Sequence, residues 1–174
     1  MSKKRYNDDY PVLITIDPGK ATGITISILP DAKNPTLQGI NATEVFSFED
    51  MAALLWRLGV TYGRTDSVIV IENFIIGGGT AAKTQAPWSL ELIGAARMIS
   101  IIWRFHFELQ TPALAKNTAS DRVLRTLAER APGWWTPTEG GHANDALRHA
   151  ATWLLRNHLM PDDVMRELVP DAVR

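Results

Sequence analysis

Two isolated carboxylates, Asp17 and Glu72, each stand at the end of an apolar stretch of the chain. Asp17 lies inside Leu13–Ile26, which is otherwise apolar, small or glycine-containing, and Glu72 closes the run "SVIVIE". A carboxylate placed at the end of a buried strand loses hydration and therefore needs a compensating partner. The residue types alone thus raise the question of what positive charge these two acids share.

Hydrophobic patterning gives the elements that must position the acids. Apolar and β-branched runs predict strands, and apolar residues at a spacing of three and four predict helices. The continuous run that ends at Glu72 is typical of a strand covered on both faces. We expect strands at Val12–Asp17, Gly23–Leu29, Thr43–Phe48, Ser67–Glu72 and Phe105–Leu109, and helices at Glu49–Tyr62, Trp88–Arg104, Ser120–Arg130 and His142–His158. This order predicts an α/β fold with a mixed five-stranded sheet and helices on both faces.

The predicted topology brings the two acids together. A right-handed crossover through the helix Glu49–Tyr62 would place the strand of Glu72 parallel to and beside the strand of Asp17. Both carboxylates would then lie near the carboxyl end of the sheet. Two buried like charges repel, and a divalent cation between them relieves the repulsion. Hard oxygen ligands favour Mg²⁺ or Mn²⁺ over zinc.

A third candidate segment is "GGHANDALRHAATWLL", in which His142 and Asp145 stand three residues apart. That spacing places both side chains on one face of the predicted helix. Gly140 and Gly141 allow a close approach of the backbone. Capping of the helix N-terminus is the alternative interpretation, and for this segment taken alone it is the favoured one.

Together the three segments resemble the RuvC-like Holliday junction resolvases of the ribonuclease H-like superfamily, particularly small phage-encoded members. The likeness covers Leu13 to Leu155 and rests on the "DPG...TG" hairpin, the acid that ends "SVIVIE" and the acid-bearing last helix. It implies an endodeoxyribonuclease that cleaves branched DNA by two-metal-ion hydrolysis. The implied ligands of two Mg²⁺ or Mn²⁺ ions per active site are Asp17, Glu72, His142 and Asp145. His142 departs from the Asp found in many members.

The same resemblance covers "TPALAKNTASDRVL", the segment that supplies a basic residue near the scissile phosphate in that family. Here that residue would be Lys116, whose charge could stabilise the transition state. A solvated loop lysine is the alternative.

The glycine-rich loop after Glu72 has two interpretations. Gly77–Thr84 reads G-x-x-x-x-A-K-T, in which Ala82 takes the place of the glycine that a phosphate-binding P-loop requires. Nothing nearby suits the rest of an NTPase, so we expect no nucleotide cofactor. A loop at the mouth of a DNA site fits better, with Lys83 on a phosphate.

Further residues are candidates for DNA contact. Phe74, Ile75 or Ile76 could wedge against unstacked bases, although they could equally complete the core. Arg97 and Arg122 are candidate phosphate contacts. Basic residues slightly outnumber acidic ones between Phe74 and His158, which permits nucleic-acid binding without requiring it.

Composition limits the remaining possibilities. The chain has 174 residues, 45% of them hydrophobic, a net charge of −1 and no cysteine. We expect one nuclease domain over residues 1–174, with a polar N-terminal segment 1–10 and an acidic tail 161–174. No run reaches membrane-spanning length and no secretory signal is visible, so a cytoplasmic protein without membrane contact is expected.

Two expectations concern partners and rival functions. The helix Trp88–Arg104 is apolar on more than one side, which predicts a homodimer interface. An ATP-dependent phosphotransferase of the actin and sugar kinase type also uses an Asp-x-Gly hairpin, but it needs a much longer chain. A non-catalytic DNA-binding or packaging protein that retains the fold remains the alternative.

Overall fold

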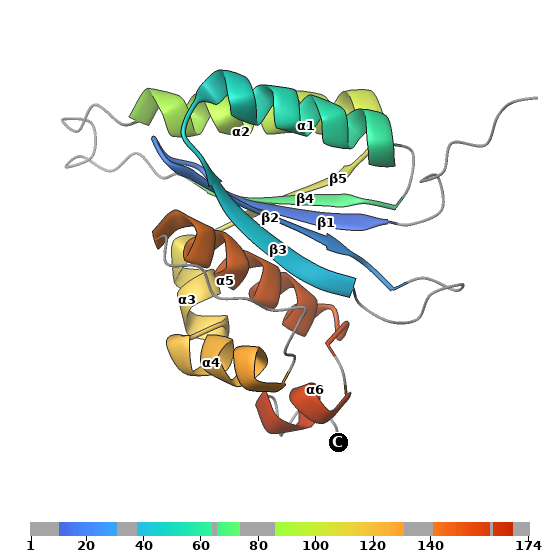
Figure 1. Cartoon of the computed structure of the whole chain (residues 1–174), viewed down its shortest axis with the longest axis vertical. Helices are drawn as coiled ribbons and strands as arrows, with labels where there is room; N and C mark the ends of the chain where they lie inside the picture. Colours follow the sequence, from blue (N-terminus) through green and yellow to red (C-terminus); the bar gives the residue numbers. More distant parts are fainter. Residues whose placement is uncertain are drawn as a thin grey trace, which may run out of the picture.

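The computed structural model describes residues 11–30, 38–63, 66–73, 86–130, 141–160 and 162–168. Five strands and six helices lie in these ranges (Figure 1). In chain order they are β1 (Val12–Asp17), β2 (Thr22–Ile28), β3 (Gln38–Val45), α1 (Phe48–Tyr62), β4 (Val68–Glu72), α2 (Ala86–Trp103), β5 (His106–Gln110), α3 (Pro112–Thr118), α4 (Asp121–Arg130), α5 (Gly141–Arg156) and α6 (Asp162–Leu168).

The strands form one mixed sheet in the order β3-β2-β1-β4-β5. β1, β2 and β3 are antiparallel neighbours, whereas β1, β4 and β5 run parallel. Because Ile16 pairs with Ile71, the residues that follow them, Asp17 and Glu72, end adjacent parallel strands at the same edge of the sheet. The predicted parallel pairing of the strands that carry Asp17 and Glu72 is therefore confirmed.

Helices cover both faces of the sheet, as Figure 1 shows. α1 and α2 lie on one face, and α5 lies on the other, with α3, α4 and α6 beyond it. Side chains alternate along a strand, so β1 and β4 at the centre of the sheet each contribute to two cores. Ile14, Ile16 and Ile71 pack with α1 and α2. Leu13 and Val70 pack with α5.

Most predicted bounds agree with the structure to within two residues, and three elements differ by more. β3 is Gln38–Val45 rather than Thr43–Phe48, and it ends before Phe48 because Ser47 already caps α1: the Ser47 Oγ accepts the Asp50 N–H at 3.0 Å. α3 lies where no helix was predicted, and Thr111 is its N-cap: Thr111 Oγ1 accepts the Leu114 N–H at 3.2 Å. α6 occupies part of the acidic tail and buries Val164 and Met165 in the same core as α5.

Among the helices that the structure describes, none is long and apolar enough to cross a membrane.

Candidate active site

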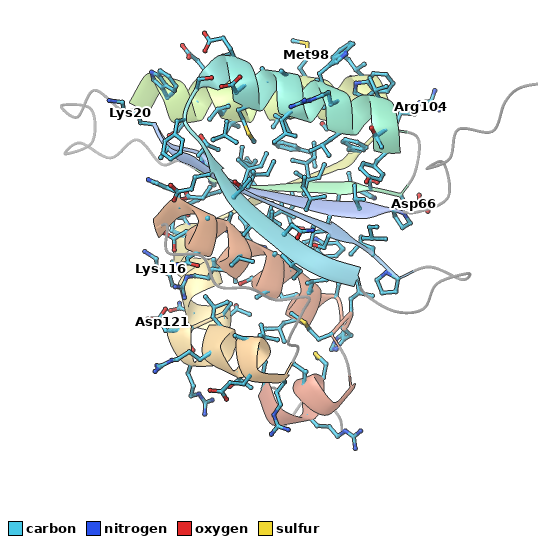
Figure 2. All side chains as sticks on the ribbon, in the orientation of Figure 1. Lys20, Asp66, Met98, Arg104, Lys116 and Asp121 are labelled. Atoms are coloured by element: carbon cyan, nitrogen blue, oxygen red, sulfur yellow. The ribbon has the colours of Figure 1, made fainter. Side chains whose placement is uncertain are left out.

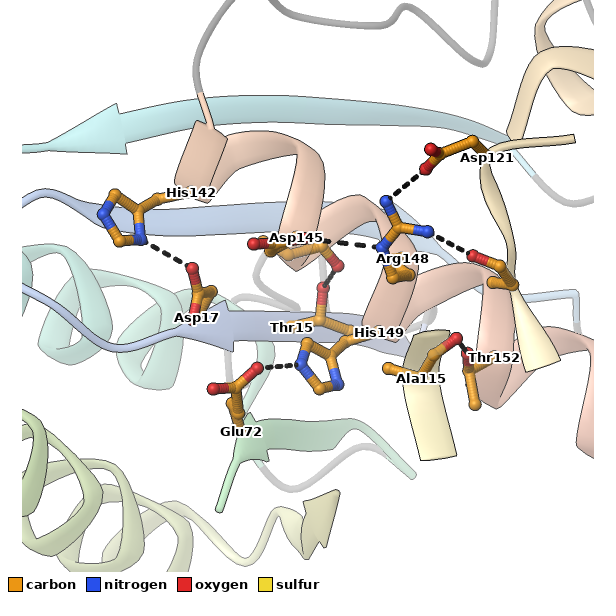
Figure 3. A network of polar contacts seen from close by, with 12 residues as sticks. Thr15, Asp17, Glu72, Ala115, Asp121, His142, Asp145, Arg148, His149 and Thr152 are labelled. Carbon is orange, nitrogen blue, oxygen red and sulfur yellow. Dashed lines mark hydrogen bonds and ion pairs between the residues drawn. The ribbon is translucent and has the colours of Figure 1, made fainter. Parts of the chain in front are cut away.

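The alternation of side chains along the strands aims both strand-end carboxylates at α5. Asp17 shares its face with Thr15, and Thr15 donates a hydrogen bond of 2.7 Å to the carbonyl oxygen of Ala146 on α5. Glu72 shares its face with Val70, which packs against α5. The two acids therefore point at the helix that carries His142 and Asp145 (Figure 3).

Asp17 is buried and bonded to His142. Its Oδ2 lies 2.7 Å from Nδ1 of His142, and the two side chains are 8% and 46% exposed. The turn after Asp17 is hydrogen-bonded to α2, since Ser89 Oγ donates to the Pro18 carbonyl oxygen at 2.8 Å. A rigid strand end and a rigid turn thus hold this carboxylate in place.

The first turn of α5 is held against the sheet by β2 and β3. Glu44 Oε1 accepts the backbone N–H groups of His142 and Ala143 at 3.1 and 3.3 Å, which satisfies two donors of the helix N-terminus. A Cβ on Gly23 would stand 1.8 Å from the His142 carbonyl oxygen. Only glycine at position 23 allows α5 to lie this close to the hairpin.

The surroundings of Asp17 favour its protonated form. Burial raises the pKa of Asp17 to about 6, and the negative charges of Glu72 and Asp145 act in the same direction. The hydrogen bond and the charge of His142 partly oppose this effect on the pKa. A carboxylate in this state gains from any cation placed beside it.

Glu72 has a partner that sequence reasoning missed. Its Oε2 lies 2.9 Å from Nε2 of His149, while Nδ1 of the same ring lies 2.7 Å from Oε1 of Gln110 on β5. His149 follows His142 by seven residues, two helical turns, so it lies on the same face of α5. That spacing is the only signal in the sequence that could have identified it.

Asp145 also contacts a nitrogen donor of α5. Arg148 Nε lies 3.4 Å from Asp145 Oδ1, and the same guanidinium donates to Asp121 Oδ1 at 2.7 Å and to the Ala119 carbonyl oxygen at 2.6 Å (Figure 3). The hydrogen bond from Arg148 lowers the pKa of Asp121. Arg148, a second residue missed from the sequence, thus joins α5 to the junction between α3 and α4.

The predicted basic residues fall in different places. Lys116 lies in the last turn of α3, not in a loop, and it is exposed. Figure 2 shows Lys116 and Lys20 on the left side of the view and Asp66 on the right. Arg122 is exposed on α4, whereas Arg97 is exposed on α2, across the sheet from α5. The candidates Phe74, Ile75, Ile76 and Lys83 lie outside the described residues.

The side chains at this site carry the kind of ligand atom, carboxylate oxygen, that a hard divalent cation prefers. Asp17, Glu72 and Asp145 supply carboxylate oxygens, and the pKa of Asp17 is raised first by burial and further by the nearby charges of Glu72 and Asp145. Within the described ranges, no three acidic or histidine side chains are gathered as a finished metal site. Each carboxylate instead contacts a nitrogen donor of α5, namely His142, His149 or Arg148.

Comparison with known proteins was made at the levels of sequence and structure. Neither a protein-family model nor a curated protein sequence matches the chain. Solved structures do match. Thermus thermophilus RuvC in complex with a Holliday junction substrate superimposes with a TM-score of 0.62 at 15% identity, over 84% of this chain and 96% of that one. The fold is that of RuvC.

Two further structures support the RuvC fold. Another structure of Thermus thermophilus RuvC gives a TM-score of 0.57 at 16% identity, covering 85% of this chain and 97% of the other. The fowlpox virus Holliday junction resolvase gives 0.54 at 12% identity, covering 82% and 97%. The predicted resemblance to RuvC and the predicted mixed five-stranded sheet with helices on both faces are therefore confirmed at the level of the fold.

Proposed function

We propose that this chain is a metal-dependent endonuclease that cleaves branched DNA, such as four-way junctions. The observation that carries the proposal is the convergence of Asp17 and Glu72, from adjacent parallel strand ends, on the face of α5 that bears His142 and Asp145. The RuvC fold supports it, because the matching structures are Holliday junction resolvases and one holds a junction substrate.

Asp17, Glu72, His142 and Asp145 would hold two Mg²⁺ or Mn²⁺ ions. When bound, such ions promote in-line attack of water on the phosphodiester and stabilise the leaving 3′ oxygen. Asp17 would be the central ligand of this set, because it is hydrogen-bonded to His142 and lies close enough to Glu72 and Asp145 for their charges to raise its pKa. Its hydrogen bond with His142 has to open only if Asp17 Oδ2 or His142 Nδ1 is itself to bind a cation, and the half-exposed ring of His142 has solvent on one side.

Lys116 would balance negative charge that develops on the scissile phosphate. Two contacts fix its helix to α5: Arg148 donates to the Ala119 carbonyl oxygen, and Thr152 Oγ1 donates to the Ala115 carbonyl oxygen at 3.3 Å. The exposed ammonium group therefore projects from a scaffold that is tied to the helix of Asp145.

A second copy of the chain would complete the enzyme. Large apolar side chains of α2 are exposed on the outer surface, with Met98 at 62%, Ile101 at 74% and Ile102 at 51%. Met98 lies on the side of α2 that faces away from the sheet (Figure 2). A two-fold dimer through this face would present two active sites to the two strands that are cut in a four-way junction.

A labelled four-way junction incubated with Mg²⁺ tests the proposal. Wild-type protein should cleave it, and Asp17→Asn should lower cleavage by at least about 100-fold, the scale of losing one electrostatic group in an active site. Asn keeps the size of the side chain but loses the charge that offsets the cations. Gel-shift affinity should be retained, because it depends on lysine and arginine contacts to phosphates.

Asp50→Asn is the matched control. It removes the same charge from an exposed position in the first turn of α1, across the sheet from α5, and should cleave like wild type. Junction binding without Mg²⁺-dependent cleavage by the wild type would instead favour the non-catalytic DNA-binding alternative. The pairing of every site carboxylate with a nitrogen donor of α5 is the observation on which that alternative rests.

A further inference from the structure

His149 links the strand end of Glu72 to the core. The histidine is 1% exposed and Gln110 is fully buried, whereas the Glu72 side chain is 21% exposed. Glu72 and Gln110 are also register partners on β4 and β5. The three residues, from three elements, therefore form a network that is rooted in the interior and reaches solvent only at Glu72.

The hydrogen-bond inventory selects one tautomer of His149. Both ring nitrogens face oxygen atoms, but a neutral ring carries one N–H, and the buried Nε2 of Gln110 has no partner. Turning the Gln110 amide so that Nε2 donates to His149 Nδ1 satisfies that donor and leaves the amide oxygen in the former place of Nε2, where an unpaired acceptor is tolerated better than an unpaired N–H. The ring N–H then lies on Nε2 and donates to Glu72 Oε2.

His149 differs from His142 in what it can reach. His142 is 46% exposed at the N-terminal end of α5, whereas His149 is 1% exposed and reaches the proposed ligands only through its contact with Glu72. A substrate phosphate therefore has no access to the His149 ring. Any effect of His149 on chemistry must pass through Glu72.

We propose that His149 is a positioning residue that holds Oε2 of Glu72, so that Glu72 offers its other oxygen, Oε1, to a divalent cation. The inference rests on the proposed metal-dependent function. Hydrogen-bond partners of metal-ligating carboxylates fix the orientation of the ligand, and their removal typically lowers metal affinity or activity by about 10- to 100-fold.

Two substitutions separate positioning from packing. His149→Gln places an amide nitrogen where Nε2 of the ring stands and keeps a donor toward Glu72. His149→Asn places its amide where Nδ1 stands and keeps only the contact with Gln110. Both replace the ring by a smaller polar side chain at the same buried site, so both should lose stability to a similar degree.

The test uses calorimetric titration of the full chain with Mn²⁺, together with the Mg²⁺ concentration that half-saturates junction cleavage. His149→Asn should weaken Mn²⁺ binding and raise the half-saturating Mg²⁺ concentration by about 10- to 100-fold, while His149→Gln should stay within about threefold of wild type. Denaturant unfolding of both variants provides the structural comparison. Should either variant fail to fold, Gln110→Leu takes its place. This substitution removes the hydrogen bond to Nδ1 of His149 and should also weaken Mn²⁺ binding.

The outcomes distinguish this inference from the proposed function. Equal Mn²⁺ affinities in the Asn and Gln variants, with a cleaving wild type, would overturn the positioning role alone. A wild type that binds Mn²⁺ but never cleaves, together with weakened binding in His149→Asn, would overturn the nuclease proposal and retain the positioning role. A wild type that binds no Mn²⁺ overturns both.

Discussion

At the scale of single residues, the three site carboxylates differ in how firmly their partners are held. The partner of Asp17, His142, is 46% exposed, whereas the partners of Asp145 and Glu72, Arg148 and His149, are 13% and 1% exposed. An exposed partner exchanges for another ligand more easily than a buried one, because water can replace it. We therefore expect the contact between Asp17 and His142 to be the one that opens when a cation binds.

The raised pKa of Asp17 makes stability depend on pH in the absence of metal. Its pKa moves from 3.8 to about 6 on folding, chiefly because of burial. The folded protein thus binds the proton more tightly than the unfolded chain, so Asp17 stabilises the fold below pH 4 and this contribution is lost as the pH rises through 6. A shift of this size is worth on the order of 3 kcal/mol.

Denaturant unfolding in EDTA, from pH 4 to 7.5, measures this contribution against Asp17→Asn, which cannot titrate. The variant should gain stability relative to wild type as the pH rises from 4 to 6, and the difference should level off above pH 6.5. A difference between the two proteins that is constant over this range would contradict the assignment of the raised pKa to Asp17.

The acids of the site were identifiable from the sequence, but their partners were not. Asp17 and Glu72 are conspicuous because a carboxylate is out of place at the end of an apolar strand. His149 and Arg148 lie in an amphipathic helix, where a buried or a solvated polar side chain is ordinary and does not indicate a site. Only the three-dimensional register of β4, β5 and α5 shows which acid each of them faces.

At the scale of elements, the close approach of α5 to the hairpin sets the geometry of the site. Gly23→Ala would place a Cβ 1.8 Å from the His142 carbonyl oxygen and 2.7 Å from the Ala143 backbone nitrogen. Since both neighbours are backbone atoms, the first turn of α5 must move. We expect a loss of about 1–3 kcal/mol in unfolding free energy, and a fall in junction cleavage because His142 and Asp145 shift with the helix.

Gly94→Ala is the control for this substitution. Gly94 lies in α2, and a Cβ there would meet no atom within 4 Å. Alanine is a better helix former than glycine, so this variant should equal wild type in unfolding free energy or exceed it by up to about 1 kcal/mol. Equal unfolding free energies of Gly23→Ala and Gly94→Ala would show that the first turn of α5 does not pack tightly against Gly23.

Long periodic elements were predictable, and short ones were not. The apolar strands and the helices α1, α2 and α5 show their pattern over many residues. α3 and α6 have seven residues each, too few for a periodic signal, and α6 is stabilised by burying Val164 and Met165 rather than by helix propensity. For α3, the pair Thr111-Pro112, a cap followed by proline at the first helical position, was a usable signal.

At the scale of the whole molecule, the proposed DNA binding would have to arise from local rather than net charge, because the net charge is −1. Junction affinity should fall steeply with salt, since each phosphate contact releases counterions. Arg122→Ala on α4 should reduce the slope of log affinity against log salt by about one. Arg57→Ala, an exposed arginine of α1 on the opposite side of the sheet, should leave the slope unchanged. An affinity that is flat from low to physiological salt would rule out phosphate contacts as the basis of binding.

The outer face of α1 and α2 is the predicted surface of homodimerisation. A groove between these helices is lined largely by apolar side chains, including Trp56, Met98 and Ile102, and Ile101 beside it is 74% exposed. Burying this surface against a second copy would stabilise a dimer at about 25 cal/mol per Å² of apolar area. Light scattering at micromolar concentration should therefore give twice the mass of one chain.

Ile101→Glu should shift the protein to the monomer mass, because dimerisation would bury an unpaired charge. Ala113→Glu, which adds the same charge to the exposed surface of α3, should leave the dimer intact. A wild type that scatters as a single chain would show that this face is not a self-association surface.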